Sequence, residues 1–275
     1  MEKFTLFQYP TTPSLSSTIH QTFAEQFQIS LEYTLTVAHP GTLAEAVKGF
    51  REQEGMGANV TMPLKEEAFG ICDQVTPRAI EAKSVNTLLW KNDQCWGDTT
   101  DGIGLVRDIT QNAGASLRDK TICILGAGGA AAGILGSLLA EEPQRIFLCN
   151  RTLSRAQKLC ARFDNPKVQV LDFQELSHHA TVAPFDWIIK ATPTCVIPPH
   201  VVKNTWTYDL AYPRIGQGAH TKFVEWSLAQ GALGSMDGIG MLVEQAAESF
   251  ALWHPGKSPQ TSPVITYCRS LIAHP

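Results

Sequence analysis

The sequence predicts an α/β protein of two domains with a cleft between them, and three observations support this fold class. The chain has 275 residues, which is long for a single compact core. Near the N-terminus, short strand-like runs alternate with helical segments, a pattern typical of a largely parallel sheet. Farther along, a glycine-rich turn at 126–129 joins a strand to a helix, as in doubly wound α/β domains.

The first domain is expected to span residues 1–101. Its strands are predicted at 3–9, 32–38, 57–62 and 84–90, and its helices at 14–27, 42–53 and 63–73. In the first helix, Ile19, Phe23 and Phe27 recur at a spacing of four, which gives one apolar face. Serines are expected to cap this helix. Pro63 is expected at the first position of the third helix, where a missing N–H costs nothing.

Helices in the C-terminal segment 237–275 are expected to complete the first domain. The longest of them is predicted at 238–254 and should pack back on that domain. Phe250 and Trp253 are then expected to fill the seam between this helix and the rest of the domain.

The second domain is expected to span residues 102–236. A connecting helix at 101–114 leads into it. Its strands are predicted at 121–125, 145–150, 168–172, 185–192 and 205–212, and its helices at 129–141 and 154–163. This order of strand, turn, helix and strand predicts a Rossmann-like, doubly wound domain.

The charge-free stretch 121–140 has a second interpretation as a membrane helix, because Gly129 and Gly133 have the spacing of a dimerisation face. Its first third is rich in β-branched residues, however, and glycines interrupt it. Glu141 and Glu142 follow directly. A strand, a turn and a buried helix therefore account for it better.

Composition limits the partners that this chain can have. Hydrophobic residues make up 44% of the chain, charged residues make up 17%, and the net charge is −4, which gives no electrostatic case for nucleic acid or a membrane. The seven cysteines are odd in number and none are spaced as C-x-x-C, which favours a reducing cytosol over a disulfide framework. The N-terminal residues do not resemble a signal peptide. A cytoplasmic protein that acts on a small molecule, as a monomer or homodimer, is expected.

The glycine-rich turn has the pattern G-x-G-x-x-A. Its residues are Gly126, Ala127, Gly128, Gly129, Ala130 and Ala131. The first glycine permits a tight turn, Gly128 lets a pyrophosphate approach the backbone, and Ala131 allows close packing of helix on strand. The N-terminus of the following helix offers free N–H groups to phosphates. The alternative is a glycine-rich turn without a ligand, but the flanking strands and helix favour a dinucleotide.

Two arginines follow the second strand of this domain, where NAD-binding proteins place an acid to hold the ribose hydroxyls. Arg151 and Arg155 are four residues apart, and Asn150 and Thr152 add short polar groups. A guanidinium matches a phosphate and is always charged. Cations at a helix N-terminus oppose the helix dipole, so a solvated basic surface is the weaker interpretation. The sequence therefore predicts NADP(H), with the arginines on its 2′-phosphate.

A lysine in the first turn of another predicted helix also opposes the dipole, which suggests a functional role. This residue is Lys65, and Asn59 and Thr61 on the preceding strand share one face with each other. Asp101, in "GDTTDGIG", is a natural partner for the lysine. From spacing alone, a surface lysine and a helix-capping aspartate account for the pattern equally well.

Taken together, these stretches resemble the shikimate dehydrogenases over nearly the whole chain. The resemblance rests on "SLS", "NVTMPLKEEAF", "SVNTL", "GDTTDGIG", "GAGGAA", "NRTLSRA" and "DGIGMLVEQAAESFALWH". It implies NADP-dependent, reversible reduction of 3-dehydroshikimate to shikimate in aromatic amino-acid biosynthesis. A quinate/shikimate dehydrogenase of broader specificity and a non-catalytic NADP-binding sensor are the alternatives.

The resemblance also implies roles for individual residues. Lys65 and Asp101 would be the catalytic pair, with Lys65 helping to deliver a proton and Asp101 orienting it. The residues implied to bind substrate are Ser14 and Ser16 at the carboxylate, and Asn59, Thr61, Lys65, Asn86, Asp101, Tyr212 and Gln245 around the hydroxyls and ring. Those added to the cofactor-binding set are Ala191, Thr192, Leu210 and Gly238. No metal is expected, since His178 and His179 lack a third ligand nearby.

Some positions depart from the family pattern. Gln8, Pro13 and Ser17 replace a glycine, a histidine and a proline, and Thr99 replaces the asparagine of N-T-D. The segment 190–195 reads K-A-T-P-T-C where the family has N-A-T-S-x-G, and 213–222 is longer than usual. Because 190–195 flanks the nicotinamide in the family, cofactor geometry there is the feature these changes would affect.

Overall fold

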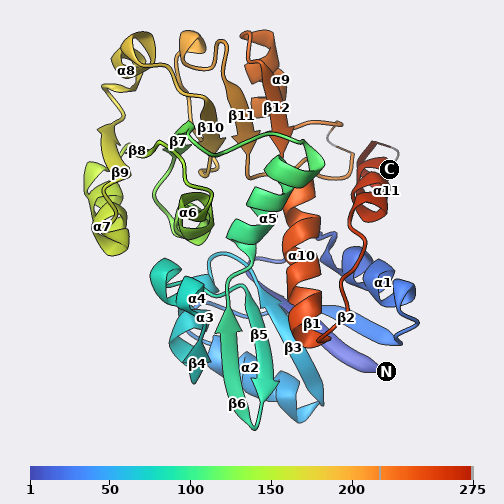
Figure 1. Cartoon of the computed structure of the whole chain (residues 1–275). Helices are drawn as coiled ribbons and strands as arrows, with labels where there is room; N and C mark the ends of the chain where they lie inside the picture. The colour runs from blue at the N-terminus through green and yellow to red at the C-terminus, as the bar shows by residue number, and fades with distance from the viewer. Residues whose placement is uncertain (217, 274–275) are drawn as a thin grey trace. The chain divides into compact units, whose positions relative to one another are not determined.

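The computed structural model describes residues 1–216 and 218–273, and the chain divides into two compact units (Figure 1). Unit 1 consists of Met1–Gly104 and Leu242–Cys268. Unit 2 consists of Leu105–Met241 and the described residues from Arg269 onward. Among the described residues, each unit contains one six-stranded sheet.

Unit 1 is built on a mixed sheet with the strand order β2-β1-β3-β5-β6-β4. Its strands are β1 (Glu2–Gln8), β2 (Leu31–Val37), β3 (Gly55–Val60), β4 (Gln74–Val75), β5 (Thr87–Lys91) and β6 (Gln94–Asp98). Pairing is parallel around β1, as predicted, but β5 runs antiparallel to both β3 and β6. Asn92 and Asp93 make the hairpin turn with φ of 51° and 62°, a conformation that these residue types tolerate.

Helices cover both faces of the unit 1 sheet. They are α1 (Ser16–Gln26), α2 (Leu43–Glu52), α3 (Lys65–Ile71), α4 (Pro77–Ala82), part of α10 (Ile239–Trp253) and part of α11 (Ser262–Ala273). Alternate residues of β1 face opposite ways: Phe7 joins the core under α2 and α3, while Phe4 joins the other side. Two details differ from the sequence prediction. Leu15, not a serine, is the N-cap of α1, and Pro63 precedes α3, whose N-cap is Leu64.

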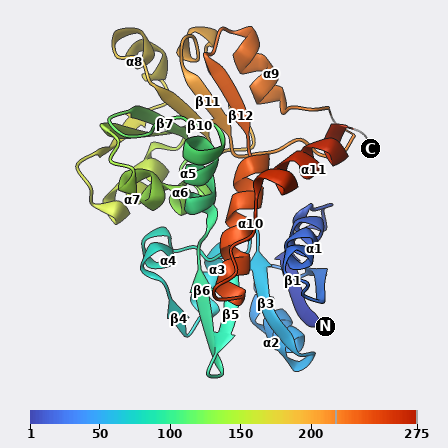
Figure 2. The same ribbon diagram turned by 45° about the vertical axis from the view of Figure 1, so that its right-hand side comes forward.

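Helix α10 packs back on the sheet of unit 1. The ring of Trp253 stacks on Phe4 with centroids 4.4 Å apart, and Phe250 meets Phe23 edge-on at 5.9 Å. Figure 2 shows α1 and α10 side by side on this face. Side chains of α10 therefore pack in the interior of unit 1.

Unit 2 has a wholly parallel sheet with the strand order β12-β11-β10-β7-β8-β9. Its strands are β7 (Thr121–Leu125), β8 (Arg145–Asn150), β9 (Val168–Asp172), β10 (Trp187–Lys190), β11 (Trp206–Asp209) and β12 (Gly234–Asp237). This is the doubly wound order, and it confirms the predicted Rossmann-like fold. The strand order reverses between β7 and β10, and ligands of such sheets bind at the carboxyl ends near that point.

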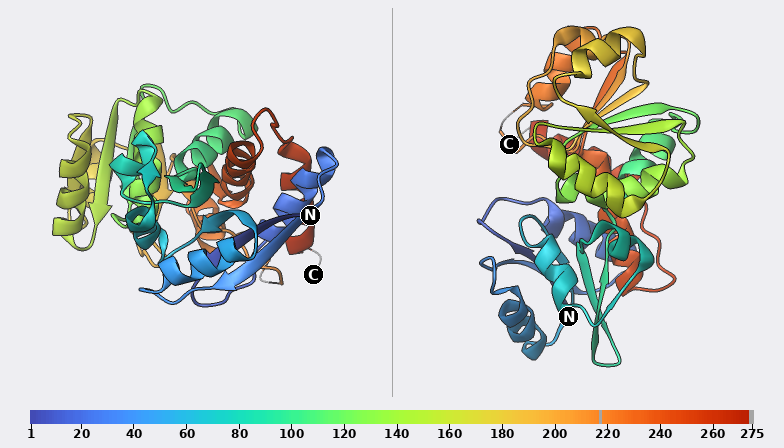
Figure 3. Two further views of the ribbon diagram at one scale, coloured as in Figure 1. Left: turned by 90° about the horizontal axis from the view of Figure 1, so that it is seen from below. Right: turned by 90° about the vertical axis from the view of Figure 1, so that its left-hand side faces the viewer.

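Helices lie on both faces of this sheet too (Figure 3, right panel). They are α5 (Asp101–Arg107), which a π-helical turn (Asp108–Asn112) continues, α6 (Gly129–Ala140), α7 (Leu153–Phe163), α8 (Leu176–Val182), the 3₁₀ turn Pro199–Val201 and α9 (Lys222–Ala229). Apolar residues of α5, α6 and α7 join one core, and those of α8 and α9 join the other. The stretch 121–140 forms β7 and α6, as predicted. No helix in the described part of the chain is long and apolar enough to cross a membrane.

Candidate active site

Lys65 and Asp101 form a close ion pair in unit 1. Lys65 is the first residue of α3 and Asp101 the first of α5. The Nζ of Lys65 donates to Oδ2 of Asp101 at 2.6 Å, and the two side chains are only 14% and 9% exposed. Burial strengthens the attraction because it removes screening water. The pairing expected for these two residues is therefore present.

Asn86 holds the other oxygen of the carboxylate. Its Nδ2 donates to Oδ1 of Asp101 at 2.9 Å and to Oε1 of Gln245 at 3.1 Å. Its Oδ1 accepts from the backbone N–H of Thr100 at 2.9 Å. Asp101 thus has a donor on each oxygen, which fixes the direction in which it presents Lys65.

Asn59 lies deeper in the same unit and has its side chain fully occupied. Its Oδ1 accepts from the hydroxyl of Tyr33 at 2.8 Å and lies 3.1 Å from Nε2 of His20. Its Nδ2 lies 3.1 Å from the hydroxyl of Ser249 and 3.1 Å from the carbonyl oxygen of Asn86. Asn59 therefore supports the residues around it through bonds within the protein.

The two N-terminal serines connect to Asn59 through Tyr33. The hydroxyl of Ser14 donates to that of Ser16 at 2.9 Å, and Ser16 is hydrogen-bonded to Tyr33. Thr61 directly follows β3 and is half-buried, and its N–H donates to the carbonyl oxygen of Phe7 at 3.1 Å. The connected side chains form what we call the unit 1 network: Ser14, Ser16, His20, Tyr33, Asn59, Lys65, Asn86, Thr87, Thr100, Asp101, Gln245 and Ser249.

His20 is a neutral packing residue of this network. It has no solvent exposure and stacks on Tyr33 with ring centroids 4.6 Å apart. Burial lowers its pKa to about 3, against an opposing effect from its bond to Asn59 and with a smaller lowering by His254. It is therefore uncharged at neutral pH.

The carboxyl end of β7 in unit 2 carries the glycine-rich turn. Gly126 has φ of +125°, and a Cβ there would lie 3.0 Å from the carbonyl oxygen of Ala191, so only glycine suits this position. By contrast, a Cβ on Gly128 or Gly129 would meet nothing within 4 Å. The first turn of α6 is thus open to an approaching group, while Ala131 is fully buried against the sheet.

Arg151 and Arg155 stand at the N-terminal end of α7 and are exposed. Within residues 1–216 and 218–273, the structure gives neither guanidinium an ion pair. Thr152 is the N-cap, and Asn150 donates through Nδ2 to its carbonyl oxygen at 2.9 Å. Two unneutralised cations thus sit where the helix dipole is also positive, which is a favourable place for an anion.

The remaining predicted cofactor residues lie along the same edge of the unit 2 sheet. Ala191 and Thr192 follow β10, and both lie against Gly126. Leu210 follows β11, and a Cβ on Gly238 would be 2.4 Å from its carbonyl oxygen, so these two backbones also touch. Tyr212 is half-buried in this unit and lines a cavity of about 950 Å³.

The departures from the family pattern have visible consequences. Lys190, which replaces an asparagine, is buried and donates to Oδ1 of Asp209 at 3.0 Å. Thr99 is buried, and its hydroxyl has no partner among the described atoms. Ser17 donates to the carbonyl oxygen of Tyr33 at 3.0 Å. Of the longer segment 213–222, Gln217 lies outside the described residues.

Sequence reasoning missed several supporting residues. Arg78 forms a two-bond pair with Asp98 at 2.7 Å for each bond, and Asp98 also accepts from the N–H of Thr99. This anchors the segment that leads to Asp101. Ser249 was missed as well, although it lies four residues after Gln245 and therefore on the same face of α10.

Comparison with known proteins agrees with this arrangement. Residues 6–88 match the family of the shikimate dehydrogenase substrate binding domain, 108–217 match shikimate / quinate 5-dehydrogenase, and 238–265 match the shikimate 5'-dehydrogenase C-terminal domain. The three matches together extend over most of the chain and reach into both units.

Individual relatives give the same result. A shikimate dehydrogenase (NADP(+)) of Alcanivorax borkumensis is 40% identical over 97% of this chain and 96% of its own length. The crystal structure of an Ael1 enzyme from Pseudomonas putida is 31% identical, with a TM-score of 0.88 over 100% of this chain and 99% of its own. The shikimate 5-dehydrogenase of Thermus thermophilus, in complex with NADP(H) and shikimate, is 25% identical, with a TM-score of 0.84 over 98% and 100%. The chain belongs to the shikimate dehydrogenase family.

Proposed function

We propose that this protein catalyses the reversible, NADP-dependent reduction of 3-dehydroshikimate to shikimate. The observation that carries the proposal is the buried Lys65–Asp101 pair inside the unit 1 network. The relatives named shikimate dehydrogenase (NADP(+)) support the same reaction. In the proposed division of labour, residues 1–101 and 237–275 bind substrate and 102–236 bind NADP.

The unit 1 network suits a polyhydroxylated acid. Ser14 and Ser16 are the proposed partners of the carboxylate. The proposed partners of the hydroxyls and ring are Thr61, Asn86, Asp101, Gln245 and Asn59, and the family resemblance adds Tyr212. A substrate that left these polar groups unpaired would lose about 1–3 kcal/mol for each, which gives discrimination among similar acids. Because the Asn59 side chain already bonds five partners within the protein, we assign it to positioning the network beneath the substrate.

Lys65 is the proposed proton donor in the reductive direction. Asp101 holds one of its N–H groups, and an ammonium has two more to offer to the substrate oxygen. As the carbonyl becomes an alcohol, negative charge develops on that oxygen, and Nζ both stabilises the charge and supplies the proton. Asp101 stays charged and keeps Nζ in place.

NADPH, when bound, supplies the hydride. The residues of unit 2 fit this cofactor: the open first turn of α6 at Gly128 and Gly129 suits the pyrophosphate, and the free cations Arg151 and Arg155 suit the 2′-phosphate. The remaining proposed contacts are Gly126, Ala127, Ala130, Asn150, Thr152, Ala191, Thr192, Leu210 and Gly238.

Initial rates of NADP reduction with shikimate test the proposal. Lys65→Ala should lower kcat/KM by about 10²–10⁴-fold, the usual contribution of a proton-transferring side chain, with NADP binding intact. Lys48→Ala, on exposed α2, is the matched control and should keep the wild-type rate. Wild-type turnover of quinate at a similar rate would indicate the broader specificity. Absence of turnover with either acid, despite tight NADP binding, would contradict the proposal and favour a sensor.

Assembly and location are also proposals. We infer a cytoplasmic enzyme, as a monomer or homodimer. The seven cysteines, all within the described residues, are free thiols, which supports a reducing compartment. Sedimentation equilibrium of the purified chain would decide between the two states.

A further inference from the structure

Two cysteines of unit 1 lie against each other outside the proposed active site. Cys72 directly follows α3, and Cys95 is on β6. Residues 95 and 97 point to the same face of β6, and a Cβ on Gly97 would lie only 2.5 Å from Sγ of Cys72. The sulfur of Cys72 therefore lies beside Cys95, and its S–H donates to the carbonyl oxygen of Ala68 at 3.0 Å.

The backbone holds the two cysteines in register. The N–H of Asp73, next to Cys72, donates to the carbonyl oxygen of Cys95 at 2.9 Å. The N–H of Cys95 in turn donates to Oδ2 of Asp73 at 2.7 Å. A disulfide demands a narrow range of backbone separations, and these reciprocal bonds keep the two residues adjacent.

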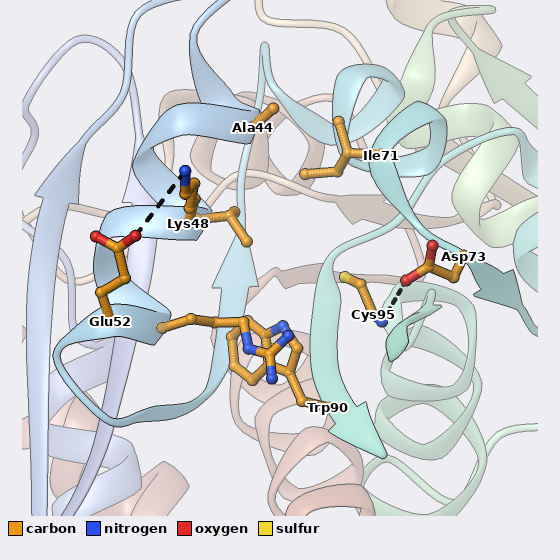
Figure 4. A pocket seen from close by; sticks show the side chains of 9 residues that line it. Ala44, Lys48, Glu52, Ile71, Asp73, Trp90 and Cys95 are labelled. Atoms are coloured by element: carbon orange, nitrogen blue, oxygen red, sulfur yellow. Dashed lines mark hydrogen bonds and ion pairs between the residues drawn. The ribbon is translucent and has the colours of Figure 1, made fainter. Parts of the chain in front are cut away.

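Cys95 also borders a pocket of about 450 Å³ that Cys72 does not line. The other lining residues are Ala44, Val47, Lys48, Arg51, Glu52, Ile71, Asp73 and Trp90. Figure 4 shows the sulfur of Cys95 turned toward the space between α2 and the labelled Ile71. The side chain is only 9% exposed, so the pocket gives a small molecule access to a thiol that larger reagents reach poorly.

The surroundings make the two thiols unequal. The adjacent thiol of Cys72 lowers the pKa of Cys95, with a smaller lowering by Arg51, and the two together exceed the opposing effects of burial and Asp73. The proximity of Cys95, together with burial, raises the pKa of Cys72. The thiolate is the reactive form of cysteine, and Cys95 lines the pocket whereas Cys72 does not, so Cys95 is the expected nucleophile of the pair.

A second close cysteine pair lacks these features. Cys123 and Cys149, on β7 and β8, also lie close together, but they are 0% and 1% exposed. Burial raises the pKa of Cys123 well above its usual value. Cys123 and Cys149 are therefore a control pair, because they are close together but buried in the core, whereas Cys95 borders a pocket.

We propose that Cys95 and Cys72 are a peroxide-reactive pair that closes to a reversible disulfide. The thiolate of Cys95 attacks one oxygen of a hydroperoxide, the O–O bond breaks, and hydroxide leaves as Cys95 becomes a sulfenic acid. The sulfur of Cys72 then attacks that of Cys95, the S–O bond breaks, and the departing hydroxide takes the thiol proton of Cys72 as water. Two thiols lose two electrons, hydrogen peroxide becomes two waters, and an external dithiol reverses the change.

This inference is independent of the proposed function. The disulfide would fasten the end of α3, a helix whose first residue is Lys65, to β6. The test of the cysteine pair measures cross-linking and not enzyme activity. Failure of the cysteine proposal would therefore not contradict the proposed function, and the reverse also holds.

The first experiment treats the native wild-type protein with hydrogen peroxide, blocks remaining thiols after denaturation and maps the peptides by mass. Free thiols should fall from seven to five, with residues 72 and 95 cross-linked, and dithiothreitol should restore all seven. Oxidation of Cys95 to sulfinic acid without a cross-link would overturn the proposal. So would a cross-link between Cys123 and Cys149 in its place.

The order of the two steps is tested with single variants and dimedone, which labels sulfenic acids. Cys72→Ser should accumulate label on Cys95, whereas Cys95→Ser should label Cys72 about tenfold less, because Cys72 does not line the pocket and burial still raises its pKa. Cys123→Ser is the control and should leave the yield of the 72–95 cross-link unchanged. Equal labelling of Cys72 in Cys95→Ser would overturn the assignment of the nucleophile.

Discussion

The surroundings of Lys65 in unit 1 and of Arg151 and Arg155 in unit 2 differ in how their charges are balanced. Lys65 is neutralised by Asp101, and Asn86 in turn holds that carboxylate. The two arginines have no ion pair within residues 1–216 and 218–273, although they lie at the positive end of a helix. The first region is preorganised by the fold, and the second is left with a charge that a ligand must balance.

This difference separates the tasks of the two regions. A group that stabilises a transition state works best when it is already oriented, because no reorganisation is then needed during the reaction. A group that selects a cofactor works by differential affinity, and an unpaired cation gives a large difference between ligands with and without a phosphate. Mutations should therefore affect rate in unit 1 and cofactor preference in unit 2.

The largest expected effect is that of Asp101→Asn. The amide has the same shape but cannot neutralise Lys65, so Nζ loses its fixed direction and a buried charge is left unpaired. We expect kcat/KM for shikimate to fall by about 10²–10⁴-fold, with the fall mainly in kcat. Steady-state kinetics and an NADP titration by fluorescence measure the two quantities. A raised KM with unchanged kcat would show that Asp101 contributes only binding.

Removing both arginines should change cofactor preference without changing chemistry. In Arg151→Ala with Arg155→Ala, we expect NADP affinity to fall by about 10²–10⁴-fold, because hydrogen bonds to charged groups contribute about 1.5–3 kcal/mol each. NAD affinity should stay the same, since NAD has no 2′-phosphate. Lys158→Ala, an exposed cation on the same helix, is the control. Equal losses for NAD and NADP would refute the phosphate assignment.

Acid should destabilise the protein through His20. Its pKa is about 3 in the folded protein and 6.5 as the reference for the unfolded chain, so below pH 6.5 the unfolded chain binds a proton that the folded protein excludes. Stability is therefore full above that pH and declines as the pH falls toward 3, by about 2 kcal/mol between pH 7 and pH 5. Urea titrations of wild type and His20→Gln check this.

The control for that experiment is His178→Gln, since His178 is exposed. The His20 variant should lose the acid-dependent part of the decline even if it is less stable at pH 7, whereas the His178 variant should behave as wild type. An undiminished pH dependence in His20→Gln would assign the acid sensitivity to other groups.

Features with a local sequence signature could be predicted. The strands β7, β8 and β9 have the predicted bounds, since their apolar runs end at glycines or polar residues next in sequence. Lys65 was singled out because a cation in the first turn of a helix opposes the dipole, and Asp101 in "GDTTDGIG" was its candidate partner. The hairpin of β5 and β6 was missed, although Asn92 and Asp93 are residues that tolerate its turn.

Features that depend on distant contacts could not be predicted. Ser249 touches Asn59 across 190 positions of sequence, and no periodicity reports such a contact. The same holds for Cys72 and Cys95, because nothing in the sequence indicates that α3 and β6 place these two cysteines side by side. Lys190 was noticed as a departure from the family, but its pairing with Asp209 required the register of β10 and β11.

The smallest expected effect is the one that most directly tests the contrast between the regions. If the arginines serve to bind a ligand, they should destabilise the protein when no NADP is bound. Each cation opposes the dipole at the start of α7 at a cost of about 0.3–1 kcal/mol. Arg155→Ala should therefore raise the free energy of unfolding by a few tenths of a kcal/mol in the absence of NADP, and lower it relative to wild type when NADP is saturating for wild type. Urea titrations with and without NADP measure both changes in the free energy of unfolding, and Lys158→Ala is the control. A variant that is less stable in both conditions would mean that Arg155 is structural, and unit 2 would then be as complete without a ligand as unit 1.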